Sequence, residues 1–335
     1  MVVTASRPVS EERPIEGEII ATVNSLLIVG CGDVARRALP WLVRRYRVYA
    51  LVREVPDMAL ARLGVTAIRG DLDDARSLDR VRSLADTVWH FAPPPAEGEG
   101  DPRTRRLLAR LARGGRVRRL VYISTTSFYG DGAGRLIDEP SPPRPSSARA
   151  RRRLAAESSL RAFGRRMGRR VCILRAPGIY AADRLPTARL MRGDPVLHAS
   201  EDVYTHHIHA DDLGRIAWAA GVRGRPNRSY NAVDDSQLRM GDYLDRVADR
   251  LGLPRTFVYA EQLSGAAILQ GLRRRQVYVS MGAQVIFQAR HAGQVYPIGA
   301  EVGAVDGDLV LEATVTPAGR GGVARLIGNG AILAE

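Results

Sequence analysis

Lysine is absent from the 335 residues of the chain, and all 50 of its basic residues are arginines. The chain therefore has no Schiff-base nucleophile, no lysine acid or base and no phosphate-loop lysine, which excludes enzyme classes built on those groups. Cysteine is scarce as well, with only Cys31 and Cys172 present. Two cysteines in apolar segments do not indicate a disulfide framework, so we expect a protein of the cytoplasm.

Long apolar runs are missing too. No stretch reaches the roughly 18 apolar residues that span a bilayer, so we predict neither a transmembrane helix nor a membrane partner. Residues 1–23 are polar and lack the basic start and the apolar segment of a signal peptide. We expect this stretch to be a flexible tail.

The formal charge of +14 is the feature that raises nucleic acid as a partner. The arginines are scattered, however, and they are not interleaved with aromatic residues, which make up only 6% of the chain. We therefore predict no nucleic-acid partner, and interpret the charge as a solvated basic surface that helps to attract anionic ligands.

Short apolar segments rich in branched residues recur along the chain, with helical stretches between most of them. They cover residues 26–29, 48–52, 65–68, 87–91, 120–123 and 171–174. This alternation predicts an α/β fold with a Rossmann-type, doubly wound parallel sheet covered on both faces. Proline-rich breaks at residues 93–95 and 140–145 follow the fourth and fifth strands, at the sheet edge where ligands bind in such folds.

The composition changes after about residue 252. Short alternating segments at 277–279, 285–287, 309–311 and 324–327, punctuated by glycines, predict a small all-β appendage. We accordingly divide the chain into the tail at 1–23, a dinucleotide-binding domain at 24–255 and a β-rich domain at 256–335.

A glycine motif joins the first predicted strand to the first predicted helix. Gly30, Gly32 and Ala35 fit the pattern G-x-G-x-x-G/A, with Asp33 and Val34 between them. The first glycine permits a tight turn, the second lets the backbone approach a pyrophosphate, and the small third residue lets helix and strand pack closely. The phosphates would lie at the helix N-terminus. The alternative is an ordinary strand-to-helix turn.

The residue after the second strand selects between the two nicotinamide dinucleotides. Arg53 holds that position and suits the 2′-phosphate of NADP, while the adjacent Glu54 leaves NAD as the alternative. We therefore predict NADP. Asp71, after the third strand, is placed either to reach the adenine or to cap a helix.

Several further segments follow in a recognisable order. They are His90-Phe91-Ala92-Pro93-Pro94, Tyr122 to Gly130, Arg153-Leu154-Ala155-Ala156-Glu157, Leu174 to Tyr180, His207 to Leu213 and Tyr230-Asn231-Ala232-Val233. With the glycine motif and Gly70-Asp71-Leu72, they resemble the NAD-dependent epimerase/dehydratase family, the extended short-chain dehydrogenases. The resemblance implies an oxidoreductase or epimerase/dehydratase acting on a sugar-nucleotide-like or small polar substrate. It also implies cofactor contacts at Leu72, Ala92, Pro93 and Pro177.

The resemblance also indicates the catalytic positions. Thr125 would orient the substrate, with Ser124 and Tyr129 beside it. The family's Tyr-x-x-x-Lys acid/base pair is replaced by Arg149 and Arg153, and a guanidinium cannot accept a proton near neutral pH. Arg153 would still hold the cofactor ribose. The altered pair keeps open a second interpretation, a non-catalytic NADP(H) sensor or scaffold protein.

Three histidines, His206, His207 and His209, invite a metal interpretation, but no carboxylate or cysteine with ligand spacing accompanies them. We predict no metal, and expect His209 to cap a following helix. The last 70 or so residues resemble the β-rich tail of PHP-type metallohydrolases. That tail leaves a hydrolase accessory fold as a third interpretation, and pairing of two chains through it leaves a homodimer as an expectation.

Overall fold

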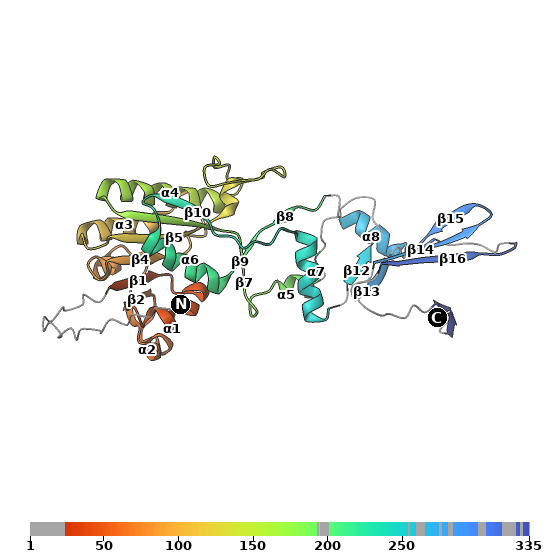
Figure 1. Cartoon of the computed structure of the whole chain (residues 1–335), viewed down its shortest axis with the longest axis horizontal. Coiled ribbons are helices and arrows are strands. Elements are labelled where there is room, and N and C mark those ends of the chain that lie inside the picture. Colours follow the sequence, from red (N-terminus) through yellow and green to blue (C-terminus); the bar gives the residue numbers. More distant parts are fainter. Residues whose placement is uncertain are drawn as a thin grey trace, which may run out of the picture.

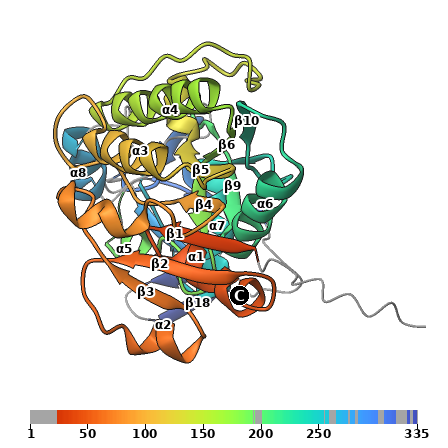
Figure 2. The same cartoon turned by 90° about the vertical axis from the view of Figure 1, so that its left-hand side faces the viewer.

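A seven-stranded parallel sheet forms the centre of the computed structural model (Figure 1), in the order β3-β2-β1-β4-β5-β6-β10 (Figure 2). The structure describes residues 24–192, 194, 201–253, 255–258, 265–274, 277–280, 284–300, 306–316, 326–328 and 331–334. The strands are β1 (Ser25–Val29), β2 (Arg47–Val52), β3 (Thr66–Arg69), β4 (Thr87–His90), β5 (Arg119–Thr125), β6 (Arg170–Ala176) and β10 (Arg228–Asn231). This confirms the predicted Rossmann-type sheet. Residues 1–23, which we predicted to be a flexible tail, lie outside the described residues.

Burial explains why these segments are strands. All five residues of β1 are buried, as a strand covered on both faces requires. The strands differ from the predicted ranges mainly at their ends. β5 and β6 continue to Thr125 and Ala176, whereas β4 ends at His90, one residue before its predicted end. The extra residues of β5 and β6 pair with each other up to the last residue of both strands.

Helices cover both faces of the sheet, as predicted. The helices α1 (Asp33–Leu42) and α6 (Ala210–Arg223) pack on one face, and α3 (Pro102–Gly114) and α4 (Ala148–Met167) pack on the other (Figure 2). Their starts follow the chain's capping residues, since Asp101 caps α3 and Ser147 caps α4 through side-chain oxygens. Shorter elements between the strands are α2 (Met58–Arg62) and the 3₁₀ turns η1 (Arg76–Val81) and η2 (Thr126–Tyr129).

Because all seven strands run the same way, their carboxyl ends lie together along one side of the sheet and their amino ends along the other. We call these two sides the carboxyl edge and the amino edge. Beyond the carboxyl edge lie β7 (Gly178–Tyr180), which pairs with β9 (His207–His209), and β8 (Tyr204–Thr205), which pairs with β11 (Leu238–Arg239). The helices α5 (Thr187–Met191) and α7 (Met240–Leu251) accompany them. In the part of the chain that the structure describes, no helix is long and apolar enough to cross a membrane.

The C-terminal part forms separate small antiparallel sheets (Figure 1). The main one is a three-stranded sheet of β14 (Gln284–His291), β15 (Gln294–Pro297) and β16 (Val310–Thr316). The other elements are β12 (Arg255–Val258), α8 (Gly265–Arg273), β13 (Val277–Ser280), β17 (Leu326–Gly328) and β18 (Ala331–Ala334). The small β appendage is thus confirmed, although α8 lies inside it. The predicted boundary at 255/256 falls within β12, and the PHP-type resemblance stays a prediction.

Candidate cofactor and active site

The glycine turn, residues 30–35, lies at the carboxyl edge between β1 and α1. Gly30 has a φ of +91°, and a Cβ there would lie 2.3 Å from the backbone nitrogen of Ala92. The residues after β4 are held against β1, because Phe91 and Ala92 both donate backbone hydrogen bonds to the carbonyl of Val29, at 2.8 and 2.9 Å. Only glycine fits this close approach.

Gly32 differs from Gly30 because a Cβ built on it meets no other atom within 4 Å. It is the N-cap of α1 and offers no side-chain oxygen to the first-turn N–H groups. Those groups are therefore left as donors for an external acceptor, and the helix dipole favours an anionic one. Val34 and Ala35 are buried in the helix–sheet packing, at 8% and 1% exposure. The turn has the shape that a dinucleotide pyrophosphate requires.

Asp33 brings a negative charge to this helix start, and neighbouring arginines engage it. Arg37 Nε donates to one carboxylate oxygen at 2.8 Å, and Arg184 Nη1 donates to the other at 3.1 Å. Arg37 also contacts Asp183. Arg184 follows β7, far along the chain, and sequence reasoning missed it. The sequence does not indicate the contact between Arg184 and Asp33, because the contact depends on how the chain folds back after β6.

Arg53 lies directly after β2 and is exposed, as is Glu54. The acids nearby are engaged by other arginines: Arg103 donates to Asp73, and its hydrogen bond is the main reason that the pKa of Asp73 is lowered. Asp71 accepts a hydrogen bond from the Asp73 N–H at 2.9 Å, which makes a turn. The helix-cap alternative for Asp71 is wrong, because η1 begins only at Arg76. Leu72 is buried at 9% exposure.

The remaining predicted cofactor positions border the same edge. Ala92 is buried beside Gly30, Pro93 is exposed just beyond it, and Pro177 is half-buried directly after β6. These residues follow the carboxyl ends of β4 and β6, on either side of β5 in the sheet. The fold therefore brings together at one edge the positions that the sequence had predicted separately.

A buried polar network, made of Ser124, Tyr129, Glu157, Arg175 and Asn231, lies at the ends of β5, β6 and β10. Glu157 and Arg175 form its centre, with 2.9 Å between Oε2 and Nη2 and exposures of 1% and 3%. Ser124 Oγ donates to Glu157 at 2.6 Å. Arg175 Nη1 donates to the Tyr129 hydroxyl at 2.7 Å, and Tyr129 donates to Asn231 at 2.8 Å. Burial alone would lower the pKa of Arg175, but the interactions with Glu157 and Tyr129 together outweigh it and raise the pKa.

The buried polar network distinguishes the three predicted catalytic hydroxyls by their burial and their partners. The hydroxyls of Ser124 and Tyr129 are engaged by protein partners in the interior. Thr125, the last residue of β5, is only half-buried, and its Oγ1 accepts from the Ser127 N–H at 3.2 Å in a local turn. Sequence reasoning missed Arg175, although it lies in the same segment, Leu174 to Tyr180, as Pro177.

Arg153 stands where the family's lysine stands, and its guanidinium points into the protein. Its Nη1 donates to the Tyr122 hydroxyl at 2.9 Å and to the Ile123 carbonyl at 2.7 Å. Burial raises the pKa of Tyr122 to about 12, against the opposing charge of Arg153. Arg149, in the tyrosine position, is exposed near the start of α4. Arg153 therefore supports the end of β5 through Tyr122 and Ile123.

His90, at the end of β4, is a fully buried neighbour of this group. Its Nε2 lies 2.7 Å from Thr104 Oγ1, and Thr104 in turn donates to Asp101 at 2.6 Å. Burial lowers the pKa of His90 to about 4, although the charge of Asp101 opposes the shift. The imidazole is neutral at physiological pH, so it serves as a packed hydrogen-bonding group.

Aromatic rings line β7 and β9 beyond the network. Tyr180 lies against His209, with 5.3 Å between ring centroids, and His207 stacks on Tyr243 at 3.8 Å. Burial raises the pKa of Tyr180, and its hydrogen bond to Asp234 raises it further. His209 caps α6 by accepting from the Asp211 N–H at 3.3 Å, which confirms its predicted capping role. Among the residues that the structure describes, no three ligand-type side chains converge as a metal site would require.

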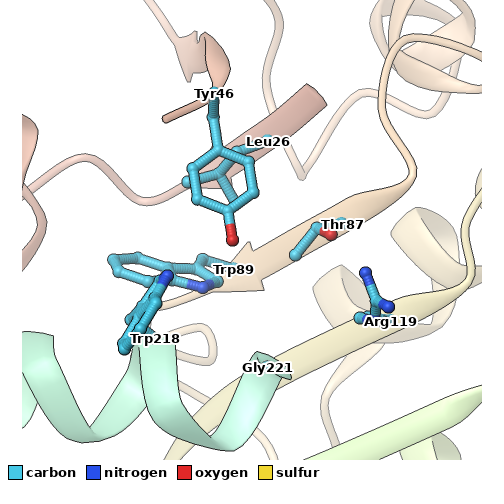
Figure 3. Close-up of a pocket in the computed structure, with 7 residues that line it drawn as sticks. All are labelled: Leu26, Tyr46, Thr87, Trp89, Arg119, Trp218 and Gly221. Carbon is cyan, nitrogen blue, oxygen red and sulfur yellow. The ribbon is translucent and has the colours of Figure 1, made fainter. Parts of the chain in front are cut away.

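A small recess elsewhere in the sheet is not part of this site. It measures about 10 Å³, room for roughly one water molecule, and is lined at the amino edge by Leu26, Tyr46, Thr87, Trp89, Arg119, Trp218 and Gly221 (Figure 3). The starts of β1, β4 and β5 supply three of these residues. The recess therefore lies at the edge opposite to the glycine turn.

A parallel sheet in this strand order, with a glycine turn at the start of α1, defines a protein of the Rossmann class. The chain belongs to the NAD dependent epimerase/dehydratase family, whose model matches residues 32–232, more than half of its length. No curated protein matches its sequence.

Solved structures share the fold of the first two thirds. MoeE5 in complex with UDP-glucose and NAD is 25% identical, with a TM-score of 0.57, and the match covers 69% of this chain and 83% of that one. A functionally unknown conserved protein from Silicibacter pomeroyi is 26% identical over 69% and 79%, with a TM-score of 0.56. The dTDP-glucose 4,6-dehydratase DesIV from Streptomyces venezuelae, with NAD and DAU bound, is 23% identical over 68% and 81%, with a TM-score of 0.58.

Proposed function

We propose that the glycine turn binds the pyrophosphate of a nicotinamide dinucleotide. The observation that carries this proposal is the pair of glycines: Gly30 is required by the chain's own packing, whereas Gly32 leaves the helix start open. Family membership and the NAD named in the titles of MoeE5 and DesIV support the same cofactor. The contacts would come from the turn at Gly30, Gly32, Asp33, Val34 and Ala35.

The other cofactor residues follow from their places along the carboxyl edge. Arg53 would bind the 2′-phosphate, which makes NADP the preferred form and leaves NAD as the alternative. Asp71 and Leu72 would border the adenine, Ala92 and Pro93 the middle of the cofactor, and Pro177 the nicotinamide. Arg153 would help to hold the cofactor ribose indirectly, by supporting the end of β5. When bound, the nicotinamide supplies a carrier of hydride.

We propose a sugar-nucleotide-like or small polar substrate. The UDP-glucose in the MoeE5 structure supports this class, since the two proteins share the fold and the family. Thr125 would orient the substrate, because it is the least buried of the three hydroxyl candidates at the end of β5. Ser124 and Tyr129 would assist by holding that strand end in place through the buried polar network.

The proton chemistry separates this oxidoreductase from the alternative, a non-catalytic NADP(H) sensor or scaffold. Arg149 and Arg153 cannot take up a proton near neutral pH. The phenols of Tyr122 and Tyr180 have raised pKa values, so both stay protonated and neither is a base. Turnover would therefore draw its proton from substrate and solvent. The missing base is the observation that favours the sensor.

Thermal unfolding with NADP, NADPH, NAD and NADH tests the binding. A ligand at about 100 times its dissociation constant stabilises the folded state by about 2.7 kcal/mol. We expect the largest rise in midpoint with NADP or NADPH, and a smaller rise in an Arg53→Ala variant. Arg62→Ala, an exposed arginine on α2, is the matched control and should behave like the parent chain. No shift with any of the four would overturn the proposal.

Turnover separates the two functions once binding is established. The protein would be incubated with UDP-glucose and other nucleotide sugars, and both cofactor absorbance at 340 nm and product composition would be followed. Conversion of any member of the panel supports the oxidoreductase or epimerase, whereas tight cofactor binding without conversion supports the sensor.

A further inference from the structure

A second cavity lies at the amino edge of the sheet, on the side opposite to the glycine turn. It is a hollow of about 530 Å³, and five arginines line it: Arg118, Arg119, Arg165, Arg169 and Arg170. We refer to it as the arginine hollow. Its walls come from the start of β5, the end of α4, the start of β6 and the turn before β10. The arginines come from three of these segments, since the turn before β10 contributes only Pro226 and Asn227.

Throughout the described part of the chain, none of these five arginines forms a salt bridge. Arg169 and Arg170 donate instead to the carbonyls of Gly115, which follows α3, and Val222, on α6, at 3.0 and 3.2 Å, so these two guanidinium groups are held toward opposite faces of the sheet. Carbonyl contacts orient a guanidinium without neutralising it, so the hollow keeps its full positive charge.

The end of α4 explains only part of this arrangement. Basic residues near a helix C-terminus are stabilised by the dipole, which accounts for Arg165. Arg118 and Arg119 belong to β5 and its approach, where no such stabilisation applies. The helix dipole therefore does not account for Arg118 and Arg119 beside Arg165, and a bound anion would stabilise all three charges.

Close contacts also join the walls of the hollow. A Cβ on Gly164 would lie 2.3 Å from the side-chain oxygen of Asn227, so the helix end and the turn before β10 are in direct contact. The carbonyl of Asn227 accepts from Arg161 at 2.8 Å. The Arg169 N–H closes the end of α4 on the Gly164 carbonyl at 2.9 Å. A preformed site loses little conformational entropy on binding.

We propose that the arginine hollow binds a compact anion carrying two or more phosphate groups. Guanidinium groups pair with phosphate oxygens in a bidentate manner. The lining contains no aromatic side chain, so a nucleobase has no surface on which to stack. The arginines line one hollow of small-molecule size, whereas a nucleic-acid polymer would be met by a stripe of charge. Condensed phosphate, free or as part of a small metabolite, fits these features.

Calorimetric titration of the full chain with tripolyphosphate, at about 0.15 M salt, tests the proposal. Arg118 and Arg165 are both exposed and make none of the carbonyl bonds above, so Arg118→Ser/Arg165→Ser should fold normally. Binding should weaken by about tenfold for each arginine removed. The matched control Arg246→Ser/Arg250→Ser removes the same charge from the exposed side of α7 and should bind like the parent chain.

Further arms distinguish the sources of any binding. Gly32→Glu places a carboxylate at the glycine turn and should leave the tripolyphosphate affinity unchanged. ATP that binds as well as tripolyphosphate indicates that the phosphates are recognised, whether free or part of a metabolite. The proposal is overturned by no measurable binding, by equal weakening in both double variants, or by loss of binding in Gly32→Glu. If duplex DNA bound more tightly than tripolyphosphate, and Arg118→Ser/Arg165→Ser lost that binding, the proposal would be overturned in favour of a nucleic-acid partner.

Discussion

The two edges of the parallel sheet use the same basic residue in different ways. At the carboxyl edge Arg37 is engaged by Asp33 and Arg175 by Glu157, while Arg53 is exposed and is the arginine there that we propose binds an anion. At the amino edge the five arginines of the arginine hollow form no salt bridge within the described residues. An engaged guanidinium positions the backbone and leaves binding to N–H groups, whereas an unengaged one is itself available to an anion.

The largest expected effect comes from breaking the ion pair of the buried polar network. Glu157→Gln would leave the guanidinium of Arg175 buried without a counter-charge, so we expect the free energy of unfolding to fall by about 3–5 kcal/mol. Urea denaturation measures this loss. Glu99→Gln removes an exposed partner of Arg151 and should change stability little.

A double variant sharpens the same point. Glu157→Leu/Arg175→Met replaces both charges with apolar groups and should recover much of the loss, because no buried charge remains. If Glu157→Gln alone cost less than about 1 kcal/mol, the pair would behave like a surface salt bridge and the assignment of the network as a rigid support would fail.

The two glycines of the turn provide the next comparison. Gly30→Ala forces a side chain onto the Ala92 backbone and an unfavourable positive φ, so we expect a loss of about 2–4 kcal/mol. Gly32→Ala meets open space and should leave stability within about 0.5 kcal/mol of the parent chain. Equal losses in the two variants, measured by thermal unfolding, would contradict the geometry of the turn.

His90 predicts a pH effect of similar size. As pH falls below 6.5 the unfolded chain protonates this histidine, while the folded chain does not until about pH 4. Stability therefore decreases across that window, by about 3 kcal/mol in all. Unfolding measured from pH 7 to 4 should show a smaller decrease in His90→Asn, and the difference between the two curves isolates this group. Parallel curves would show that His90 is not buried in neutral form.

Arg149 carries the smallest expected effect. It is exposed, and Arg149→Ala should change stability by no more than about 0.5 kcal/mol. Any turnover should survive, because a guanidinium provides no proton-transfer base. Loss of turnover in a stable variant with unchanged cofactor affinity would assign Arg149 a role at the active site.

The sequence allowed the sheet to be predicted, because buried parallel strands are continuous apolar runs and Gly30 marks the turn after the first of them. It did not allow the buried polar network to be predicted. Glu157 and Arg175 are 18 residues apart, and nothing in their spacing shows that α4 and β6 bring them together. The same limit hid Arg184 beside Asp33, and the arginine hollow, which exists only where four segments meet.

Hydrogen exchange along the chain tests most directly the assignment of different ligands to the two edges. With NADPH, the account predicts slowed exchange at residues 30–38, which include the first turn of α1, where no side chain caps the N–H groups, and no change at residues 164–170. With tripolyphosphate it predicts the reverse. Protection of residues 164–170 by NADPH, with none at 30–38, would contradict the account.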